Sequence, residues 1–449
     1  MPRDLLRFWF TFEEGVSREE YLRHGFALMV LKYAVDATLI GLSTGTLWTP
    51  LDYLQSVPLL MSTRLEGAPP YVASALAVWT LPFLWIGMSM TIRRLLDAGA
   101  SAWWALLFFV PVICYGLFAV LAAAPSRPPR PTRAHTVPGG ERLPSALLSM
   151  AAGAAFGLAL LWLGVVMLES YGLAVFMGTP FLIGLFTAYL LRRRYPASVR
   201  ETLEVVSMTV ALVAGSAFLI GFEGAVCLLM IAPLGLVIAL MGGIVGRLLA
   251  ATGEDLARGA ALVAILFPGG ASLETGPLPA TLREVTSSVV IAAPAERVWD
   301  HVVSFSRIPE PSSLLFRLGL AYPTHAEIRG AGVGAVRYCH FSTGTFVEPI
   351  TIWEPGRRLA FDVIGSPRPL EELTPWDVAP PHLEGYLVSR AGEFRLVPLP
   401  GGRTRLEGST WYEQRLRPEG YWVVFSDFII SRIHRRVLEH IASEAEMPR

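Results

Sequence analysis

The hydrophobic positions follow two different patterns along this 449-residue chain. Up to about residue 280 they form long continuous stretches, and six of these come close to the roughly 20 apolar residues that a membrane-spanning helix needs. A seventh stretch, residues 25–43, is weaker because it contains Lys32 and Asp36, which lie four apart on one helix face and can pair. Residues 260–268 are apolar but short, and we expect them at the membrane interface. The six clear stretches are residues 71–90, 102–123, 146–168, 172–191, 203–221 and 224–249.

From residue 281 the apolar positions alternate with polar ones, which is typical of half-buried strands. Pro294 then marks the start of a short helix over 294–304, and a second short helix is expected over Leu314–Leu318. The last segment, 418–444, has an apolar residue at every third or fourth position and predicts one long amphipathic helix. Between these helices the pattern predicts strands over 322–329, 333–342, 345–354, 358–364, 386–397 and 403–413.

The distribution of charge supports the same division. Residues 1–280 contain 35 charged side chains and the shorter remainder contains 39, so only the second part has the composition of an ordinary soluble domain. The formal net charge is zero, which argues against a nucleic-acid partner, and three cysteines exclude a disulfide scaffold. We therefore predict an all-α polytopic membrane region followed by an α+β domain. The expected parts are 1–124 with about three membrane helices, a Pro/Arg-rich linker 125–145, four membrane helices over 146–250, an interfacial linker 251–280, and the soluble domain 281–449.

Arginine placement predicts an orientation in a bacterial inner membrane. The linker and the loop after residue 191 are rich in arginine, whereas the loops Glu169–Tyr171 and Phe222–Glu223 have no basic residue. By the positive-inside rule the linker, the arginine loop and the C-terminal domain are cytoplasmic. The N-terminal part disagrees, because three spans before the linker place Arg18, Arg23 and the Arg93–Arg94 turn outside. Either residues 25–43 do not fully cross the membrane, or the positive-inside rule fails in this part.

Two pairs of glycines on predicted membrane helices have the spacing that lets helices approach closely, and they suggest association between copies of the chain. They are Gly153 with Gly157 and Gly242 with Gly246.

Two motifs near the N-terminus resemble a bacterial inner-membrane family of unknown function. The sequence departs from that family at Leu96, where its members have histidine, and at Leu22, where they often have tryptophan. The resemblance implies no activity, and we interpret the second motif as an interfacial anchor with aromatic residues at the start of a span. The matching residues are Phe12, Ser17, Arg18, Glu20 and Tyr21 in the first motif, and Arg93, Arg94, Leu95, Asp97, Gly99, Ser101, Trp103 and Trp104 in the second.

Residues 283–444 resemble the helix-grip superfamily, also called SRPBCC, which includes START-like lipid carriers and polyketide cyclases and dehydrases. The order of elements carries the resemblance, together with a strand followed by Ala293, Pro294, Ala295, Val298 and Trp299, and then Phe305. The resemblance implies a curved antiparallel sheet that grips the last helix, with a cavity between them. This fold hosts many functions, so it does not by itself identify one.

Predicted turns indicate which side chains face that cavity. A two-residue turn at Thr343–Gly344 pairs Phe341 with Phe346, Cys339 with Glu348 and Arg337 with Ile350. A five-residue turn over Pro398–Gly402 pairs Leu396 with Thr404 and Phe394 with Leu406. Arg337 and Glu348 then lie near each other inside, either as a polar anchor for a ligand or as a structural ion pair. The candidate cavity residues are Arg337, Cys339, Phe341, Phe346, Glu348, Ile350, Phe361, Phe394, Thr410, Tyr412, Trp422, Phe425 and Ile429.

The sequence contains no recognisable catalytic constellation, metal-ligand spacing or cofactor motif. Gly330, Gly332 and Gly334 predict a turn between strands, and His434 and His440 are six apart and face different ways. The leading hypothesis is a membrane-anchored protein that binds a lipid or another hydrophobic small molecule. The alternatives are a cyclase- or dehydrase-like enzyme using Glu348, Tyr412 or Arg337, and an assembly protein whose cavity is smaller than about 300 Å3. The Pro-rich segment 365–385 covers the cavity mouth, touches the membrane or acts as a spacer.

Overall fold

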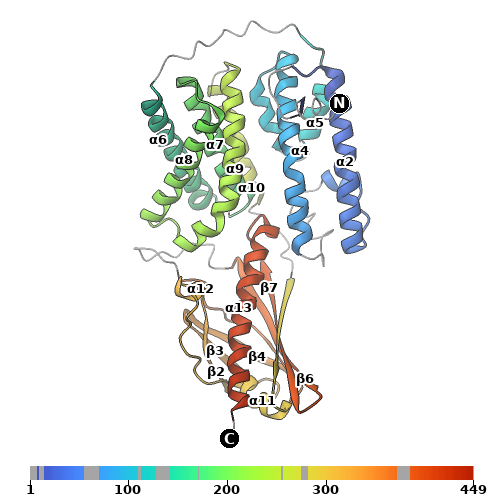
Figure 1. The fold of residues 1–449 in the computed structure, drawn as a ribbon, viewed down its shortest axis with the longest axis vertical. Helices are drawn as coiled ribbons and strands as arrows, with labels where there is room; N and C mark the ends of the chain where they lie inside the picture. The colour runs from blue at the N-terminus through green and yellow to red at the C-terminus, as the bar shows by residue number, and fades with distance from the viewer. Residues whose placement is uncertain are drawn as a thin grey trace. The chain divides into compact units, whose positions relative to one another are not determined.

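The computed structural model divides the chain into two compact units. The first comprises Met1–Ala217 with Ile231–Pro279, and the second comprises Phe218–Met230 with Ala280–Arg449. The predicted membrane regions therefore fall in the first unit except for residues 218–230, which are assigned to the second (Figure 1). The structure describes residues 8–9, 15–54, 70–109, 113–127, 141–169, 171–253, 256–274, 282–371 and 385–447.

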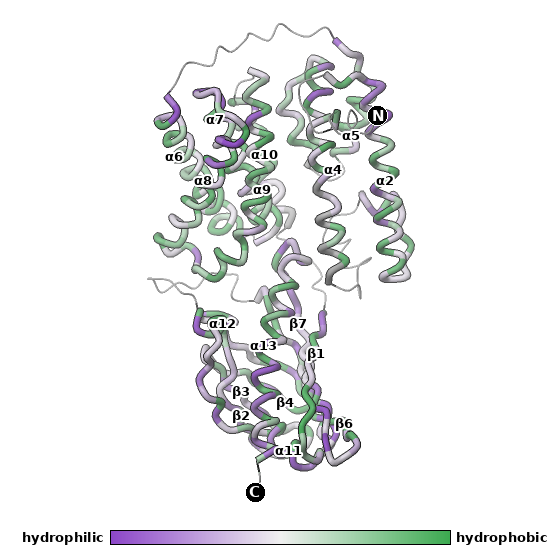
Figure 2. Tube along the Cα trace, in the orientation of Figure 1, coloured by the Kyte–Doolittle hydropathy of each residue, from purple (hydrophilic) through white to green (hydrophobic). Residues whose placement is uncertain are grey.

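The described residues of the first unit are helical, as the sequence predicts. Among the described residues, five helices are long and apolar enough to cross a membrane (Figure 2), which indicates a multi-pass membrane protein. Another long helix, α4 (Pro70–Asp97), has 28 residues and so is about 42 Å long. The five are α2 (Arg18–Thr44), Arg142–Met167 (α6 Arg142–Leu161 with η3 Trp162–Met167), Ala174–Arg194 (η4 Ala174–Gly178 with α7 Thr179–Arg194), α8 (Val199–Leu219) and α9 (Ala225–Ala251).

The weakest predicted span forms a complete helix. Ser17 and Glu20 make a capping box at the start of α2, so two of its free backbone N–H groups are satisfied. Further along, Lys32 Nζ lies 2.5 Å from the carboxylate of Asp36, and Tyr53 donates a hydrogen bond to the same carboxylate at 2.6 Å. These contacts pair the two charges within the helical unit through Oδ2 of Asp36 and confirm the predicted pair.

Two other expectations for this unit differ in outcome, and only the first was wrong. The single span expected over 102–123 is instead two short helices, η2 (Ala102–Phe109) and α5 (Ile113–Ala123). The segment expected at the interface over 260–268 belongs to a 19-residue helix, α10 (Leu256–Glu274), and its interfacial location stays a prediction. Hydropathy alone could not separate these cases, because a short broken hairpin and a continuous span can have the same apolar composition.

The second N-terminal motif forms a fixed turn at the end of α4. Arg94 pairs with Asp97 and donates from Nε to the carbonyl of Leu121 at 3.1 Å. Trp103 is only 1% exposed and its ring lies 5.5 Å from that of Tyr189, so it joins the N-terminal helices to α7. Only Trp104, which is 47% exposed, can take the aromatic-anchor role expected of both.

The glycine pairs pack helices of the same chain together. A Cβ on Gly242 would lie 1.9 Å from the backbone oxygen of Phe181, and one on Gly246 would lie 1.9 Å from that of Leu185. Gly153 faces Thr187, and Gly157 faces Ile183. The surfaces that the sequence offered for association between copies are thus already filled by neighbouring helices.

The second unit has a seven-stranded antiparallel sheet with the order β1-β7-β6-β5-β4-β3-β2. Its long helix α13 (Glu419–Glu446) packs along β1 and β7 (Figure 1). The element order is the predicted one, and the fold is the helix grip. The other elements are β1 (Leu282–Ile291), α11 (Ala295–Val303), α12 (Leu314–Arg317), β2 (Pro323–Arg329), β3 (Val336–Phe341), β4 (Gly344–Glu354), β5 (Arg358–Asp362), β6 (Leu387–Leu399) and β7 (Arg403–Gln414).

The strand registers differ from the predicted ones by two residues at both hairpins. Arg337 pairs with Glu348 and Cys339 with Phe346, while Leu396 pairs with Leu406. The first turn is Ser342–Thr343, which has the predicted length but begins one residue earlier. The second turn is Pro400–Gly402, which is two residues shorter than predicted. A register shift of two residues leaves each side chain on the same face of the sheet, so the predicted inner face remains correct.

Candidate functional site

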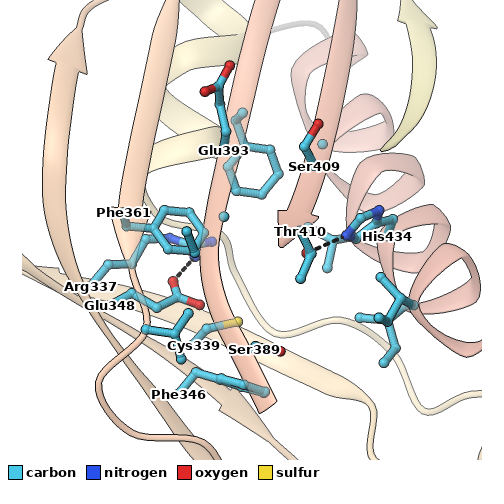
Figure 3. Close-up of a pocket in the computed structure, with 18 of the residues that line it drawn as sticks. Arg337, Cys339, Phe346, Glu348, Phe361, Ser389, Glu393, Ser409, Thr410 and His434 are labelled. Atoms are coloured by element: carbon cyan, nitrogen blue, oxygen red, sulfur yellow. Dashed lines mark hydrogen bonds and ion pairs between the residues drawn. The ribbon is translucent and has the colours of Figure 1, made fainter. Parts of the chain in front are cut away.

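A cavity of about 120 Å3 lies between the inner face of the sheet and α13 (Figure 3). β3 to β7 supply one wall, and α13 supplies Ile430, Ile433, His434, Val437 and Leu438. The alternation of β-strands turns every second residue inward, which is why Arg337, Cys339 and Phe341 all reach it. Most of the lining is aliphatic or aromatic, so the cavity suits an apolar group.

Two opposite charges are buried in this apolar wall. Arg337 is 1% exposed and Glu348 is 5% exposed, and they form an ion pair across adjacent strands. Figure 3 shows the Glu348 carboxylate directed toward the guanidinium. Burial of two charges requires close pairing, because each alone would lose several kcal/mol of hydration.

The guanidinium of Arg337 is not fully satisfied by this pairing. Its Nε and Nη2 atoms have no hydrogen-bond acceptor among the described residues. Three rings lie 5.5 Å from its Cζ, those of Phe305, Phe361 and Phe394. Aromatic faces attract a cation but accept no conventional hydrogen bond, so two donors of a buried charge remain unused.

Each charge of the pair changes the pKa of the other. Burial raises the pKa of Glu348, and the Arg337 guanidinium opposes that rise. Burial alone would lower the pKa of Arg337, but the Glu348 carboxylate raises it. Burial also raises the pKa of the Cys339 thiol to about 12, so this thiol is protonated and a poor nucleophile at neutral pH.

The helix side of the cavity contributes a neutral histidine. Burial lowers the pKa of His434 to about 4. Its Nε2 lies 2.7 Å from the hydroxyl of Thr410 (Figure 3), and its Nδ1 lies 3.3 Å from that of Ser287. One ring nitrogen donates and the other accepts, so both hydroxyls fix the ring in place.

Eight of the thirteen candidate cavity residues line this cavity, and their role in binding stays a prediction. The eight are Arg337, Cys339, Phe341, Phe346, Glu348, Phe361, Phe394 and Thr410.

The other five lie elsewhere in the unit. Ile350 belongs to the main core, and Tyr412 donates a hydrogen bond at 2.5 Å to Asp427 of α13 and packs in a separate cluster with Val285 and Ile430. Trp422 donates to the carbonyl of Arg417 at 3.2 Å, and Phe425 packs on it with ring centroids 6.2 Å apart. Ile429 joins a separate cluster around Phe316 and Leu320.

Sequence reasoning missed the cavity-facing stripe of α13. The repeat in the sequence predicts an apolar face made of Trp422, Phe425, Ile429, Ile433, Val437 and Ile441. Of these, only Ile433 and Val437 line the cavity, whereas the lining also includes Ile430, His434 and Leu438. A helix whose apolar residues recur every three or four positions can rotate by one residue without losing the pattern. The polar flanking residues Ser389, Glu393 and Ser409 also border the cavity, and no sequence signal distinguished them.

The described residues hold no group of three or more His, Cys, Asp or Glu side chains that could bind a metal ion. Gly330, Gly332 and Gly334 all have positive φ angles, as the predicted turn requires. Most of the Pro-rich segment, including Leu373 and Trp376, lies outside the described residues. Its described part is held by Leu370, which is buried beside Leu320.

The cavity volume bears on the three functional hypotheses. About 120 Å3 is smaller than the roughly 300–1,000 Å3 of sites that enclose a drug-sized ligand. It is close to the size of an apolar cavity that holds one benzene ring. The volume is therefore too small for a complete lipid and large enough for a ring or the end of a chain.

Comparison with known proteins identifies two separate regions. Residues 9–133 match the model of a protein family of unknown function, DUF805, and residues 283–418 match the model described as polyketide cyclase / dehydrase and lipid transport. No curated protein matches the chain.

Solved structures similar to the C-terminal region include three from different organisms. The Zhui aromatase/cyclase from a Streptomyces species is 20% identical, with 37% of this chain and 94% of that chain covered and a TM-score of 0.24. A protein from Nitrosospira multiformis is also 20% identical, with 36% and 95% covered and a TM-score of 0.23. Truncated norcoclaurine synthase from Thalictrum flavum is 14% identical, with 39% and 99% covered and a TM-score of 0.26.

At these values the similarities carry no argument about function. The family models, by contrast, match the two regions that the residues themselves had pointed to. The chain thus joins an N-terminal region that matches the DUF805 family model to a C-terminal domain that matches the model described as polyketide cyclase / dehydrase and lipid transport.

Proposed function

We propose that this chain is a multi-pass membrane protein whose C-terminal domain binds the apolar end of a hydrophobic small molecule or lipid. The observation that carries the proposal is Arg337, a buried guanidinium beside the cavity with two donors that no described residue accepts. A buried donor left unpaired costs about 1–3 kcal/mol, and more on a charged group. An oxygen atom of a bound ligand would satisfy these donors.

The charge of the site favours a neutral ligand group. Glu348 already compensates the charge of Arg337, so a second carboxylate would leave a net negative charge in an apolar wall. A carbonyl, ester or hydroxyl oxygen accepts hydrogen bonds without that penalty. The ligand class is therefore an amphipathic molecule with an uncharged oxygen close to a ring or chain that fits about 120 Å3.

Native mass spectrometry of the full chain in detergent tests the proposal. We expect a bound small molecule on the wild-type protein, and its loss from the double variant Arg337→Met/Glu348→Leu, which removes both charges while keeping side-chain volume. The double variant avoids leaving one buried charge unpaired, so the domain is expected to remain folded.

A second ion pair supplies the matched control. Arg390 Nε lies 2.8 Å from Glu413 on the exposed side of the sheet, outside the cavity lining. Arg390→Gln/Glu413→Gln should retain the ligand. A wild-type protein without ligand, or an unchanged amount of ligand on the Arg337 variant, contradicts the proposal.

One observation favours the assembly alternative. The small volume of the cavity is what we expect if the domain's own side chains fill the space and its surface serves association. Under that function the double variant would carry no less small molecule than the wild type, because neither would carry any. The same spectra therefore separate the two functions.

A further inference from the structure

We infer that the C-terminal domain lies on the side of the membrane opposite the arginine-rich turns, outside the cytoplasm. This inference rests on the proposed membrane location, but not on ligand binding. It replaces the cytoplasmic side that the sequence predicts, and it follows from the course of the helices within the first unit.

The N-terminus of α2 and the C-terminus of α4 lie at one end of that unit. Tyr21 and Thr91 are joined by a hydrogen bond of 3.1 Å between their hydroxyls. Arg93 donates to the carbonyl of Phe8 at 2.7 Å, and the Phe8 ring lies 4.9 Å from that of His24. α2 and α4 are therefore antiparallel crossings that begin and end at this shared face.

The next two helices leave this face and return to it. α5 ends where Arg94 donates to the carbonyls of Leu121 and Ala124. The backbone N–H of Arg127 then donates to Asp97 at 2.8 Å, so the chain is back at the end of α4. η2 has 8 residues and α5 has 11, and neither reaches the roughly 20 residues of a crossing.

This return resolves the conflict in the N-terminal part. With two crossings before the linker, and not three, Arg18, Arg23, Arg93 and Arg94 lie on the same side as the linker. The positive-inside rule then holds for both halves of the unit.

The arginines of the second half also meet at one end. Arg142 at the start of α6 lies 3.2 Å from Glu201 at the start of α8. Arg247 at the end of α9 donates to Thr202 at 3.3 Å. α7 ends with Arg192, Arg193 and Arg194. One turn before them, Tyr189 packs on Trp103, and Trp103 follows the Arg93–Arg94 turn. The arginine ends of both halves thus lie at one level.

α10 starts at this level and runs to the other end. A Cβ on Gly259, in the first turn of α10, would lie 2.3 Å from the Trp103 ring. Phe267 packs instead against Gly164 near the end of η3 and Gly178 at the start of α7, which are far from the arginines of those helices. With 19 residues, α10 is about 28 Å long and matches the hydrocarbon thickness.

The charges at the two ends of α10 agree with this direction. Arg258 lies in its first turn and Glu274 at its end. The described parts of the connecting segments on the opposite face, 45–54, 168–169, 171–173 and 220–224, contain no basic residue. Seven crossings therefore separate a cytoplasmic N-terminus from residue 282, where the C-terminal domain begins.

The consequence concerns the source of the ligand. A cavity outside the cytoplasm receives molecules from the outer leaflet or from the extracytoplasmic space. Metabolites confined to the cytoplasm cannot reach it.

Reporter fusions to the full chain test the inference. Alkaline phosphatase fused after Arg449 should be active and green fluorescent protein at the same position dark, because each folds on one side only. The same reporters fused after Gly253, between α9 and α10, should give the reverse. Fluorescence at both positions would show that α10 does not cross, and phosphatase activity at both would show that the arginine face is not cytoplasmic; either result overturns the inference.

Labelling in intact cells gives a readout without a fusion. Ser312→Cys, at an exposed position of the domain, should react with a membrane-impermeant maleimide, whereas Glu141→Cys, beside Arg142, should react only after lysis. The wild-type protein sets the background of its three cysteines. Labelling of Ser312→Cys only after lysis overturns the inference. If the chain is instead released by alkaline carbonate, the membrane location itself fails, which is a distinguishable result.

Discussion

At the scale of single residues, the Arg337–Glu348 pair controls the stability of the C-terminal domain. Glu348→Gln leaves a buried guanidinium without a counter-charge, and we expect a loss of about 3–5 kcal/mol in the free energy of unfolding. The measurement is urea denaturation of residues 281–449. Arg337→Met/Glu348→Leu should recover most of that loss, and a single variant as stable as the wild type would mean that the pair is exposed to water in solution.

His434 makes the stability of the same domain depend on pH. Burial lowers its pKa from 6.5 to about 4, so below pH 6.5 the unfolded state binds a proton that the folded state excludes. Stability is complete above pH 6.5 and falls as the pH drops toward 4, by at most about 3 kcal/mol at roughly 1.4 kcal/mol per pH unit.

The control for this effect is His434→Gln, which keeps hydrogen-bonding capacity toward Thr410 but does not titrate. Its unfolding free energy should vary less between pH 6.5 and 4 than that of the wild type. Equal pH dependence of the two proteins would assign the effect to other groups.

At the scale of elements, the crossing of α7 and α9 depends on glycine. A Cβ at Gly242 or Gly246 would lie 1.9 Å from a backbone oxygen of α7, and backbone cannot move aside as a flexible side chain can. We expect Gly246→Ala to destabilise the helical unit by about 1–3 kcal/mol or more, measured by thermal unfolding in detergent.

Gly235 on the same helix provides the matched comparison, because a Cβ there would meet nothing within 4 Å. Gly235→Ala should be neutral or slightly stabilising, since alanine favours the helical conformation. Similar losses for both variants would argue against close packing as the cause.

The sequence was most informative about which segments of the C-terminal domain form strands and helices. The alternating strands and the long last helix of the C-terminal domain were predictable because each has a period matched to its own geometry. The registers and the rotation of α13 were not, because turn length and a one-residue rotation leave the apolar pattern unchanged. The hairpin of η2 and α5 was missed for a related reason, since hydropathy records composition and not whether a chain turns back.

At the scale of the whole molecule, the two halves of the helical unit hold together through one core. Trp103 and Leu106 from the N-terminal half share it with Tyr189, Val245 and Leu249 from the second half. We therefore expect residues 1–133 and 134–449, expressed together as separate chains, to purify as a complex.

The interface can be weakened at one position. Trp103→Ala removes the ring that packs on Tyr189 and Gly259, and such a truncation costs about 3–5 kcal/mol. The exposed neighbour Trp104 serves as the comparison, and Trp104→Ala should leave the complex intact. If the two wild-type fragments do not purify together, the covalent linker is needed to hold the two halves in one complex.

The buried thiol of Cys339 has a practical consequence for this domain. Residues 281–449 contain no other cysteine, and this one is protonated and 6% exposed, so alkylation must wait until the sheet and α13 separate locally. The rate of alkylation therefore reports how often the grip opens. A molecule bound in the cavity would slow the alkylation of Cys339. The alkylation rate therefore measures whether the cavity is occupied, even when the bound molecule has not been identified.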